Sequence, residues 1–375
     1  MLARTIWPAR TTSICLRRYH AERHSSLQPL AWVISDTNPL HELRATALAT
    51  ALGLPYTVKR PKPARLPPLM QRQMLSLQSL VSPTRTAFSH ISNTNTQADG
   101  LPRVVIGSSP DSLMGVLETK ERSQGRSFSV FYGLPDTKIN SIDALLLSRL
   151  DQMKLRAKGP ARDQLDNALF TMLPFSGSPK TPAVVSNEPN IVVCLGPGVE
   201  PSGFHMLVDD VDRLFDALAH LPTQNISMVL SKQLHKSLRR KLTAQMPQHI
   251  RTVDLATSSV SPADILVNAS QVVVSADDLD SLSLAISLHK PVYVFGEERT
   301  EGLLRNYYRL LDTNNLVRRF YPRGSRYSYM LMPDITSEVD EFSAIRDHDP
   351  WAKYNLQADL DQIIAFIQSR VESDQ

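Results

Sequence analysis

Short apolar runs alternate with amphipathic stretches along most of the chain. Short aliphatic and β-branched runs between polar turns are typical of strands buried on both faces. Longer stretches with apolar positions at i, i+3, i+4 and i+7 are typical of helices that cover a sheet. The alternation therefore predicts an α/β protein built on parallel sheets.

The first half of the chain predicts strands and helices separated by two polar stretches. We expect strands at 30–35, 56–58, 103–106, 128–132 and 144–147, and helices at 41–52, 70–81 and 112–120. The proline-rich residues 61–68 and the polar residues 82–102 are expected to be loops. Periodicity is weak across residues 151–189, so we place a domain boundary near residues 175–189.

The second half repeats the alternation more clearly. We expect strands at 190–195, 226–230, 250–255, 272–274 and 292–295, and helices at 207–220, 234–246, 262–268 and 302–311. The predicted core face of the helix at 207–220 consists of Val208, Val211, Leu214, Phe215 and Leu218. Apolar positions from Leu356 to Val371 predict a long terminal helix, with Trp351 anchoring its start. The fold expected is two Rossmann-like lobes, at residues 26–182 and 183–350, followed by the amphipathic helix at 351–375.

The first 25 residues are strongly basic. They hold five arginines and one acid, Glu22, so their charge of 5 − 1 = +4 equals the formal net charge of the whole chain. An Arg-rich, acid-poor leader is typical of a mitochondrial presequence, and a basic tail without structure is the alternative. The remaining residues balance near zero, which disfavours a nucleic-acid-binding protein.

Two further features of composition narrow the class. No run approaches the ~18 apolar residues of a membrane-spanning helix. The two cysteines, Cys15 and Cys194, give no disulfide framework and suit a reducing compartment. Cys194 lies inside an apolar run and is expected in the core rather than as a reactive thiol.

An acidic turn is the first candidate site. Ser275, Asp277, Asp278 and Asp280 lie between a predicted strand and a predicted helix, where α/β folds bind ligands. The aspartates would themselves occupy the helix N-terminus, and one contact with a diphosphate would cost about 4 kcal/mol at an effective dielectric near 20. Helix capping is the expected role, and a Mg²⁺ site is the alternative. We predict neither a resident metal nor a cofactor.

A glycine-containing loop at residues 196–203 is the second candidate. It follows a strand and precedes a helix, so the amides of Gly196 and Gly198 could face a phosphate. Pro201 occupies the place of the third glycine of the dinucleotide-binding motif, and Glu200 adds repulsion. A plain strand-to-helix turn is the alternative to a ligand-binding loop.

A basic segment is the third candidate. Lys232, Lys236, Arg239 and Arg240 lie on the predicted helix at 234–246 or next to it. Such a face could meet an anionic lipid surface, cardiolipin included, or an acidic protein partner; a solvated helix face is the alternative. The sequence contains no His-Glu-x-x-His, Cys-x-x-Cys or Gly-x-Ser-x-Gly motif, so we predict no catalytic residue.

Three stretches resemble the mitochondrial fission "elongated mitochondria" (ELM) family, whose architecture is similar to that of two-domain GT-B glycosyltransferases. The first is the strand 31–36 ending in Asp36, with a helix that closes on Leu52-Gly53-Leu54-Pro55. The second is Ser275-Ala276-Asp277 with the strand at 290–294. The third is the segment 295–320. Together they lie within residues 30–322.

The chain departs from the family pattern where a nucleotide-sugar would be held. The resemblance implies a Ser after the Asp of the turn and a Glu seven residues beyond that Asp, but Asp278 and Leu284 stand there. A Gly-rich turn after the first strand is replaced by residues 37–40, and an Arg-containing turn after the third by Ser108-Ser109-Pro110. These changes argue against a glycosyltransferase activity in this chain.

The resemblance implies a role in mitochondrial fission, and in the best-known form of the family the recruitment of a dynamin-related GTPase to the outer membrane. We therefore expect a mitochondrial, non-catalytic interaction protein. The alternative is a glycosyltransferase-like enzyme that holds a nucleotide-sugar in the interdomain cleft. An outer-membrane recruiter faces the cytosol, whereas the basic leader indicates the matrix, so the submitochondrial location stays open.

Overall fold

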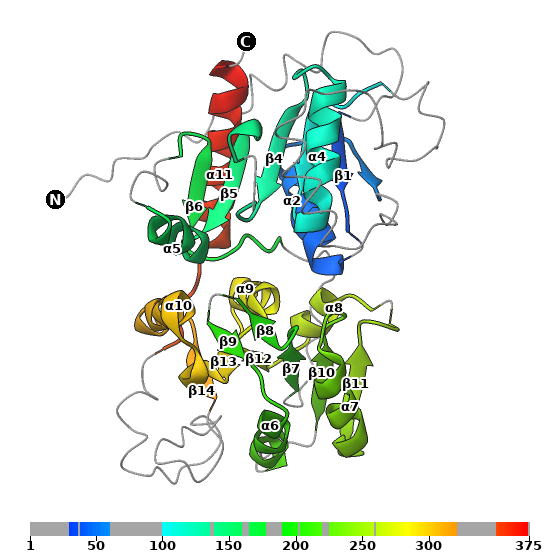
Figure 1. The fold of residues 1–375 in the computed structure, drawn as a ribbon, viewed down its shortest axis with the longest axis vertical. Helices are drawn as coiled ribbons and strands as arrows, with labels where there is room; N and C mark the ends of the chain where they lie inside the picture. Colours follow the sequence, from blue (N-terminus) through cyan, green and yellow to red (C-terminus); the bar gives the residue numbers. More distant parts are fainter. Residues whose placement is uncertain are drawn as a thin grey trace, which may run out of the picture.

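The computed structural model describes residues 30–36, 38–60, 100–135, 139–159, 165–177, 190–201, 203–219, 225–258, 260–320 and 350–373. They form two α/β lobes, which lie one above the other in Figure 1. The expected presequence and the helix expected at 70–81 lie outside the described residues. None of the described helices combines the length and apolar character that a membrane crossing requires.

The N-terminal lobe contains a parallel sheet in the order β2-β1-β3-β4-β5-β6. Its strands are β1 (Ala31–Ile34), β2 (Tyr56–Lys59), β3 (Val104–Gly107), β4 (Phe128–Tyr132), β5 (Ala144–Ser148) and β6 (Ala168–Thr171). Its helices are α2 (Pro39–Ala51), α4 (Pro110–Arg122) and α5 (Arg149–Ala157). Ala45, Leu48 and Ala49 of α2 are fully buried, as their spacing predicts.

The C-terminal lobe repeats this plan with the sheet order β11-β10-β7-β12-β13-β14, again parallel throughout. The strands are β7 (Ile191–Leu195), β10 (Ile226–Leu230), β11 (Ile250–Asp254), β12 (Gln271–Ser275), β13 (Val292–Phe295) and β14 (Arg318–Phe320). The helices are α6 (Asp209–Ala219), α7 (Lys236–Gln245), α8 (Pro262–Val267), α9 (Leu279–Ser287) and α10 (Gly302–Thr313). Two parallel-sheet lobes confirm the predicted fold class.

Several elements escaped the sequence pattern. Neither α5 nor the edge strands β6 and β14 were expected, and the loop after β7 contains a small antiparallel hairpin, β8 (Val199–Glu200) with β9 (Phe204–His205). The assignment of Val208 to the core was wrong: α6 begins one residue later, and Val208 is 40% exposed.

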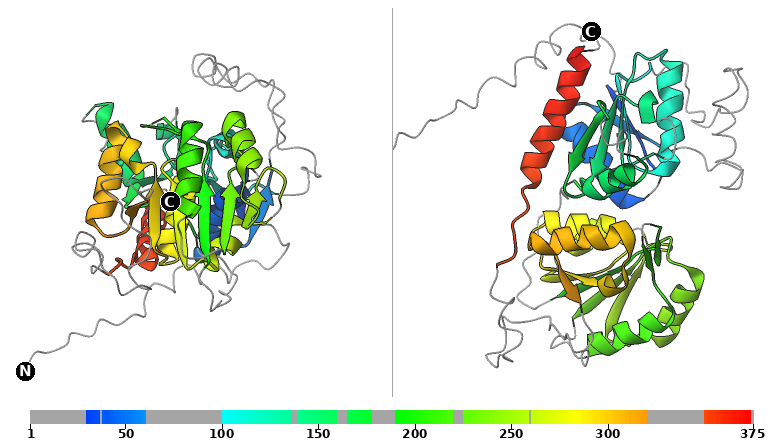
Figure 2. Two further views of the ribbon diagram at one scale, coloured as in Figure 1. Left: turned by 90° about the horizontal axis from the view of Figure 1, so that it is seen from below. Right: turned by 60° about the vertical axis from the view of Figure 1, so that its left-hand side comes forward.

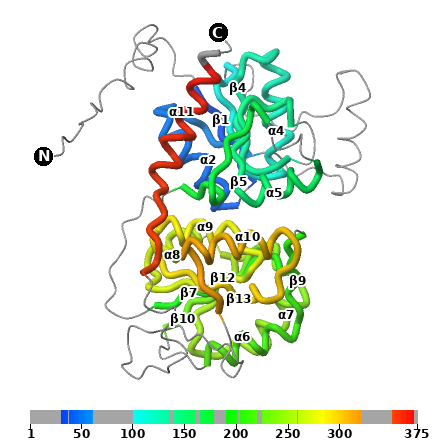
Figure 3. The backbone as a smooth tube through the Cα atoms, turned by 90° about the vertical axis from the view of Figure 1, so that its left-hand side faces the viewer, coloured from blue at the N-terminus to red at the C-terminus, as the bar shows by residue number. Residues whose placement is uncertain are grey.

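The terminal helix α11 (Leu356–Ser373) returns to the first lobe, and Figures 2 and 3 show it running along one side of that lobe. Ile363 and Ile367 are buried in the N-terminal core. Before α11, Trp351 packs edge-on against Tyr293 of β13, with the ring centroids 5.4 Å apart. The Arg318 guanidinium lies 4.3 Å from the Trp351 ring centroid. The chain is thus fixed to the second lobe just before it returns to the first.

Candidate functional site

The glycine loop and the acidic turn meet at the carboxyl ends of the paired strands β7 and β12. The backbone N–H of Gly196 donates to Ser275 Oγ at 2.9 Å, and the Ser275 hydroxyl donates to Asp277 Oδ1 at 2.6 Å. The N–H of Gly198 donates to the other Asp277 oxygen, Oδ2. Four of the predicted site residues therefore form one hydrogen-bonded cluster.

The Asp277 carboxylate fills the space that an external anion would need in this loop. A Cβ added to Gly196 would lie 2.7 Å from Asp277 Oδ2, closer than atoms in van der Waals contact, so a larger residue there would displace the Asp277 carboxylate. Burial raises the pKa of Asp277, while the hydrogen bonds from Ser275 and Gly198 oppose that rise. The loop has the form of an anion cradle, and the chain supplies the carboxylate that fills it.

The other two aspartates of the turn face elsewhere. Asp278 is the N-cap of α9, and its carboxylate accepts from the Ser281 N–H at 3.1 Å. Burial, together with repulsion from Asp280 and Asp277, raises the pKa of Asp278 to about 7. Asp280, in the first turn of α9, points to the other lobe. Among the described residues no group of three or more His, Cys, Asp or Glu side chains is placed to hold a metal ion.

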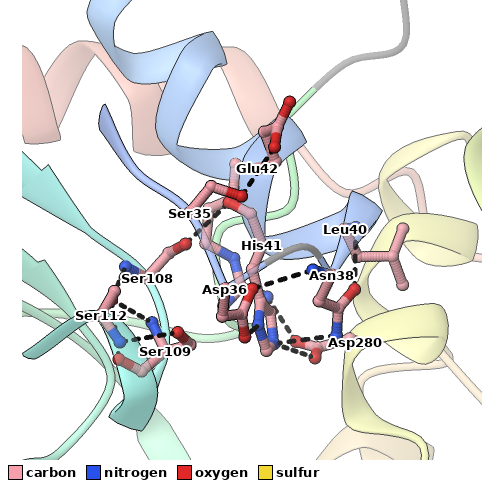
Figure 4. A network of polar contacts seen from close by, with 11 residues as sticks. Ser35, Asp36, Asn38, Leu40, His41, Glu42, Ser108, Ser109, Ser112 and Asp280 are labelled. Carbon is pink, nitrogen blue, oxygen red and sulfur yellow. Dashed lines mark hydrogen bonds and ion pairs between the residues drawn. The ribbon is translucent and has the colours of Figure 1, made fainter. Parts of the chain in front are cut away.

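Asp280 is bound by two side chains of α2 across the boundary between the lobes. His41 Nε2 lies 3.0 Å from Asp280 Oδ2, and Arg44 Nη2 lies 2.5 Å from Oδ1. The second ring nitrogen of His41, Nδ1, lies 2.8 Å from Asp36 Oδ2 at the end of β1. Figure 4 shows His41 between the two carboxylates, one from each lobe.

The backbone around His41 holds it in place. Asn38 caps α2 by accepting from the Leu40 N–H at 3.0 Å, and its own N–H donates to Asp36 at 2.9 Å. The Ser108 hydroxyl donates to the His41 carbonyl at 2.7 Å. Ser109 forms a capping box with Ser112 at the start of α4. The serine turn at residues 108–109 thus positions α2 and caps α4.

Charge in this network is set by its carboxylates. Burial alone would lower the pKa of His41, but Asp280 and Asp36 raise it to about 9. Burial likewise opposes ionisation of Asp280, yet Arg44 and His41 lower its pKa. At neutral pH His41 is therefore a cation whose two N–H groups donate to two carboxylates. In that state it offers no lone pair to a substrate.

Further contacts join the lobes beyond this network. Leu40, Leu150 and Leu173 of the N-terminal half are buried in the core of the C-terminal lobe. Lys154 of α5 pairs with Glu200 of β8 at 3.3 Å, and the Tyr307 hydroxyl of α10 donates to the Met172 carbonyl at 3.3 Å. Polar and apolar contacts together hold the two lobes against each other.

Sequence reasoning did not find His41 or Arg44, and it named Asp36 only for its place after the first strand. Their partner Asp280 is 239 and 236 positions away from His41 and Arg44, so no local spacing marks the pairing. The available signal was topological: Asp36 and Asp280 each follow a strand that ends at the edge where the two sheets face each other.

The basic segment lies apart from both clusters. Lys232 precedes α7 rather than lying on it, and His235 is its N-cap. Arg239 pairs with Asp254, and its guanidinium also donates to the Ser231 carbonyl. Lys232, Lys236 and Arg240 are exposed. Of the four predicted residues, Arg239 therefore has a structural role and the other three face solvent.

Comparison with protein families places the chain. The family model described as "Mitochondrial fission ELM1" matches residues 41–339, which is most of the chain. The chain belongs to the mitochondrial fission ELM1 family. As a member of this family it is a mitochondrial fission factor, and the ELM resemblance read from the sequence is confirmed. No curated protein matches the chain.

Solved structures of other proteins are similar to this ELM1-family protein. MnaA of S. aureus, solved with UDP, has 13% sequence identity and a TM-score of 0.43. The match covers 78% of this chain and 84% of MnaA. Over 92% of both chains, the spinosyn rhamnosyltransferase SpnG has 15% identity and a TM-score of 0.41. The calicheamicin glycosyltransferase CalG4 has 8% sequence identity and a TM-score of 0.40. The match covers 92% of this chain and 95% of CalG4. These likenesses add nothing about chemistry.

Proposed function

We propose that this ELM1-family protein acts in mitochondrial fission as a non-catalytic interaction protein, with a dynamin-related GTPase as its partner. The observation that carries the proposal is the Asp277 carboxylate, which accepts from the Gly198 N–H and the Ser275 hydroxyl. In parallel α/β folds ligands bind beyond the carboxyl ends of the strands. Here that position is filled by the chain itself.

Electrostatics supports the same conclusion. A sugar diphosphate entering the loop would displace one carboxylate and approach a second, Asp278, which caps α9. Each ionised carboxylate at ~4 Å would cost about 4 kcal/mol at an effective dielectric near 20. With a pKa of about 7, Asp278 carries this charge in about half of the molecules at neutral pH. Neither the loop at residues 196–203 nor the turn at 275–281 contains a Lys or Arg that could offset this repulsion. The two cations across the lobe boundary, Arg44 and His41, are already paired with Asp280.

The alternative function, if it is an inverting glycosyltransferase-like enzyme, would need a base between the lobes. His41 is the residue best placed by position, at the start of α2 and facing the other lobe. With a pKa of about 9 and both ring nitrogens directed at carboxylates, it is unsuited to accept a proton near neutral pH. The network therefore favours a structural role for His41.

A ligand screen on the full chain separates the two functions. UDP-, GDP- and TDP-sugars are added with and without Mg²⁺, and both the melting temperature and sugar release are followed. A ligand at 100 times its Kd adds about 2.7 kcal/mol to the free energy of unfolding, which raises the melting temperature by several degrees. The proposal predicts no such rise and no release, together with co-purification of a dynamin-related GTPase from mitochondrial extracts.

Turnover of any nucleotide-sugar would contradict the proposal if Asp277→Asn abolished it. Asp361→Asn, at an exposed position on α11, is the matched control for that substitution. The submitochondrial location has its own test, since protease added to intact mitochondria digests a cytosol-facing protein and spares a matrix protein.

A further inference from the structure

The outer surface of α7 carries cations that the fold does not use. Leu238 and Leu242 are buried in the C-terminal core, and they fix the orientation of the helix. At about 100° per residue, Lys236 and Arg240 lie roughly opposite these leucines on the helical wheel. Both are exposed, as is Lys232 in the preceding turn. These three residues, called the α7 crest below, project away from the core.

The acids beside α7 are already paired through its flanking cations. Arg239 pairs with Asp254 of β11, and Lys241 pairs with Asp212 of α6 at 2.5 Å. Residues 231–249 contain no Asp or Glu. The α7 crest is therefore left with a charge of +3 that is not balanced within its own segment. Further along α6, the exposed Asp209 and Asp216 limit the positive surface to α7 itself.

We propose that the α7 crest docks on an anionic lipid surface. A bilayer presents many phosphates in one plane, which suits two cations on one helix and a third in the turn before it. The segment exposes no large apolar side chain, so attachment by the crest is electrostatic adsorption without insertion. Helix α7 belongs to the C-terminal lobe. It starts beside the glycine loop, where the His235 N–H donates to the Pro197 carbonyl at 3.0 Å, and it lies in the lower part of that lobe in Figure 1.

This inference is independent of the adaptor role, because vesicle binding is measured without any protein partner. Near an anionic surface each Lys or Arg contributes roughly a fivefold change in partitioning, so three contribute roughly 100-fold. Such binding must also weaken steeply with salt, because exposed charges are screened over about 8–10 Å at physiological ionic strength.

The test is co-sedimentation of the full chain with phosphatidylcholine vesicles that contain cardiolipin. The triple variant Lys232→Gln, Lys236→Gln, Arg240→Gln is expected to bind roughly 100-fold more weakly than the wild type. The control is Arg122→Gln, Lys158→Gln, Arg309→Gln, which removes the same charge from exposed positions on three other helices or their ends. It should stay within about threefold of the wild type. Residues 1–25 keep their own arginines in every protein compared.

Equal loss in the two triple variants, or equal binding to vesicles of phosphatidylcholine alone, would overturn the proposal. So would a result in which the α7 variant binds vesicles normally but loses a co-purifying acidic protein, since the crest would then be a protein interface. Circular dichroism of both variants confirms that the fold is intact, as expected for substitutions at exposed positions.

Discussion

His41 links the stability of the protein to pH at the scale of a single residue. Its folded pKa, about 9, lies above the value of about 6.5 expected when the chain is unfolded. Protonation therefore stabilises the folded state fully below pH 6.5, and the contribution falls as pH rises from 6.5 to 9. Its side chain is 14% exposed, so the effect is only modestly screened.

The variant His41→Gln should lose about 2–3 kcal/mol of unfolding free energy at pH 6, because the shifted pKa and the buried carboxylates both depend on the imidazolium. Urea denaturation at pH 6, 7.5 and 9.5 measures the difference from wild type, which should shrink as pH rises. His249→Gln, at an exposed position, is the control and should show no difference at any pH. A loss that does not change with pH would mean that His41 is not charged in the fold.

Candidate site residues could be predicted from the sequence where the residues that form the site are close along the chain. The turn at residues 275–280 and the glycines at 196 and 198 were recognised because each follows an apolar strand. Their mutual contact follows from the pairing of β7 with β12. The pairing of His41 and Arg44 with Asp280 depends on how two separately folded sheets face each other, which no local pattern encodes.

At the scale of elements, burial explains which strands were predictable. β7 and β12 lie inside their sheet, and each contains three consecutive buried aliphatic residues, so both are easily recognised in the sequence. β14 has the sequence Arg-Arg-Phe and lies at a sheet edge, where only Phe320 is buried. β6 is another edge strand, with three of its four residues half-buried. Polarity explains why β14 was missed, because edge strands can be polar. β6, with the sequence Ala-Leu-Phe-Thr, is apolar but only four residues long.

The terminal helix α11 is an element whose sequence pattern predicted amphipathicity but not the surface that it covers. Ile363 is fully buried against the N-terminal core, whereas its neighbour Ile364 is only half-buried. Ile363→Ala should therefore cost about 2–4 kcal/mol of unfolding free energy, and Ile364→Ala less than about 1.5 kcal/mol. Chemical denaturation of the two variants measures both values. Equal costs would contradict the packing of α11 on the first lobe.

At the scale of the whole molecule, polar and apolar contacts join the two lobes where they face each other. Asp280 is held from the first lobe by His41 and Arg44, and Lys154 reaches from α5 to Glu200. The buried Leu40, Leu150 and Leu173 add an apolar seam. Together these contacts hold the two lobes against each other.

The most direct test of this account is a crystal structure of the full chain grown with a nucleotide-sugar and Mg²⁺. We predict that the loop at residues 196–198 holds no diphosphate and that Asp277 still accepts from the Gly198 N–H. A diphosphate bound to the amides of Gly196 and Gly198, with Asp277 turned away or bound to Mg²⁺, would contradict the account and indicate an enzyme.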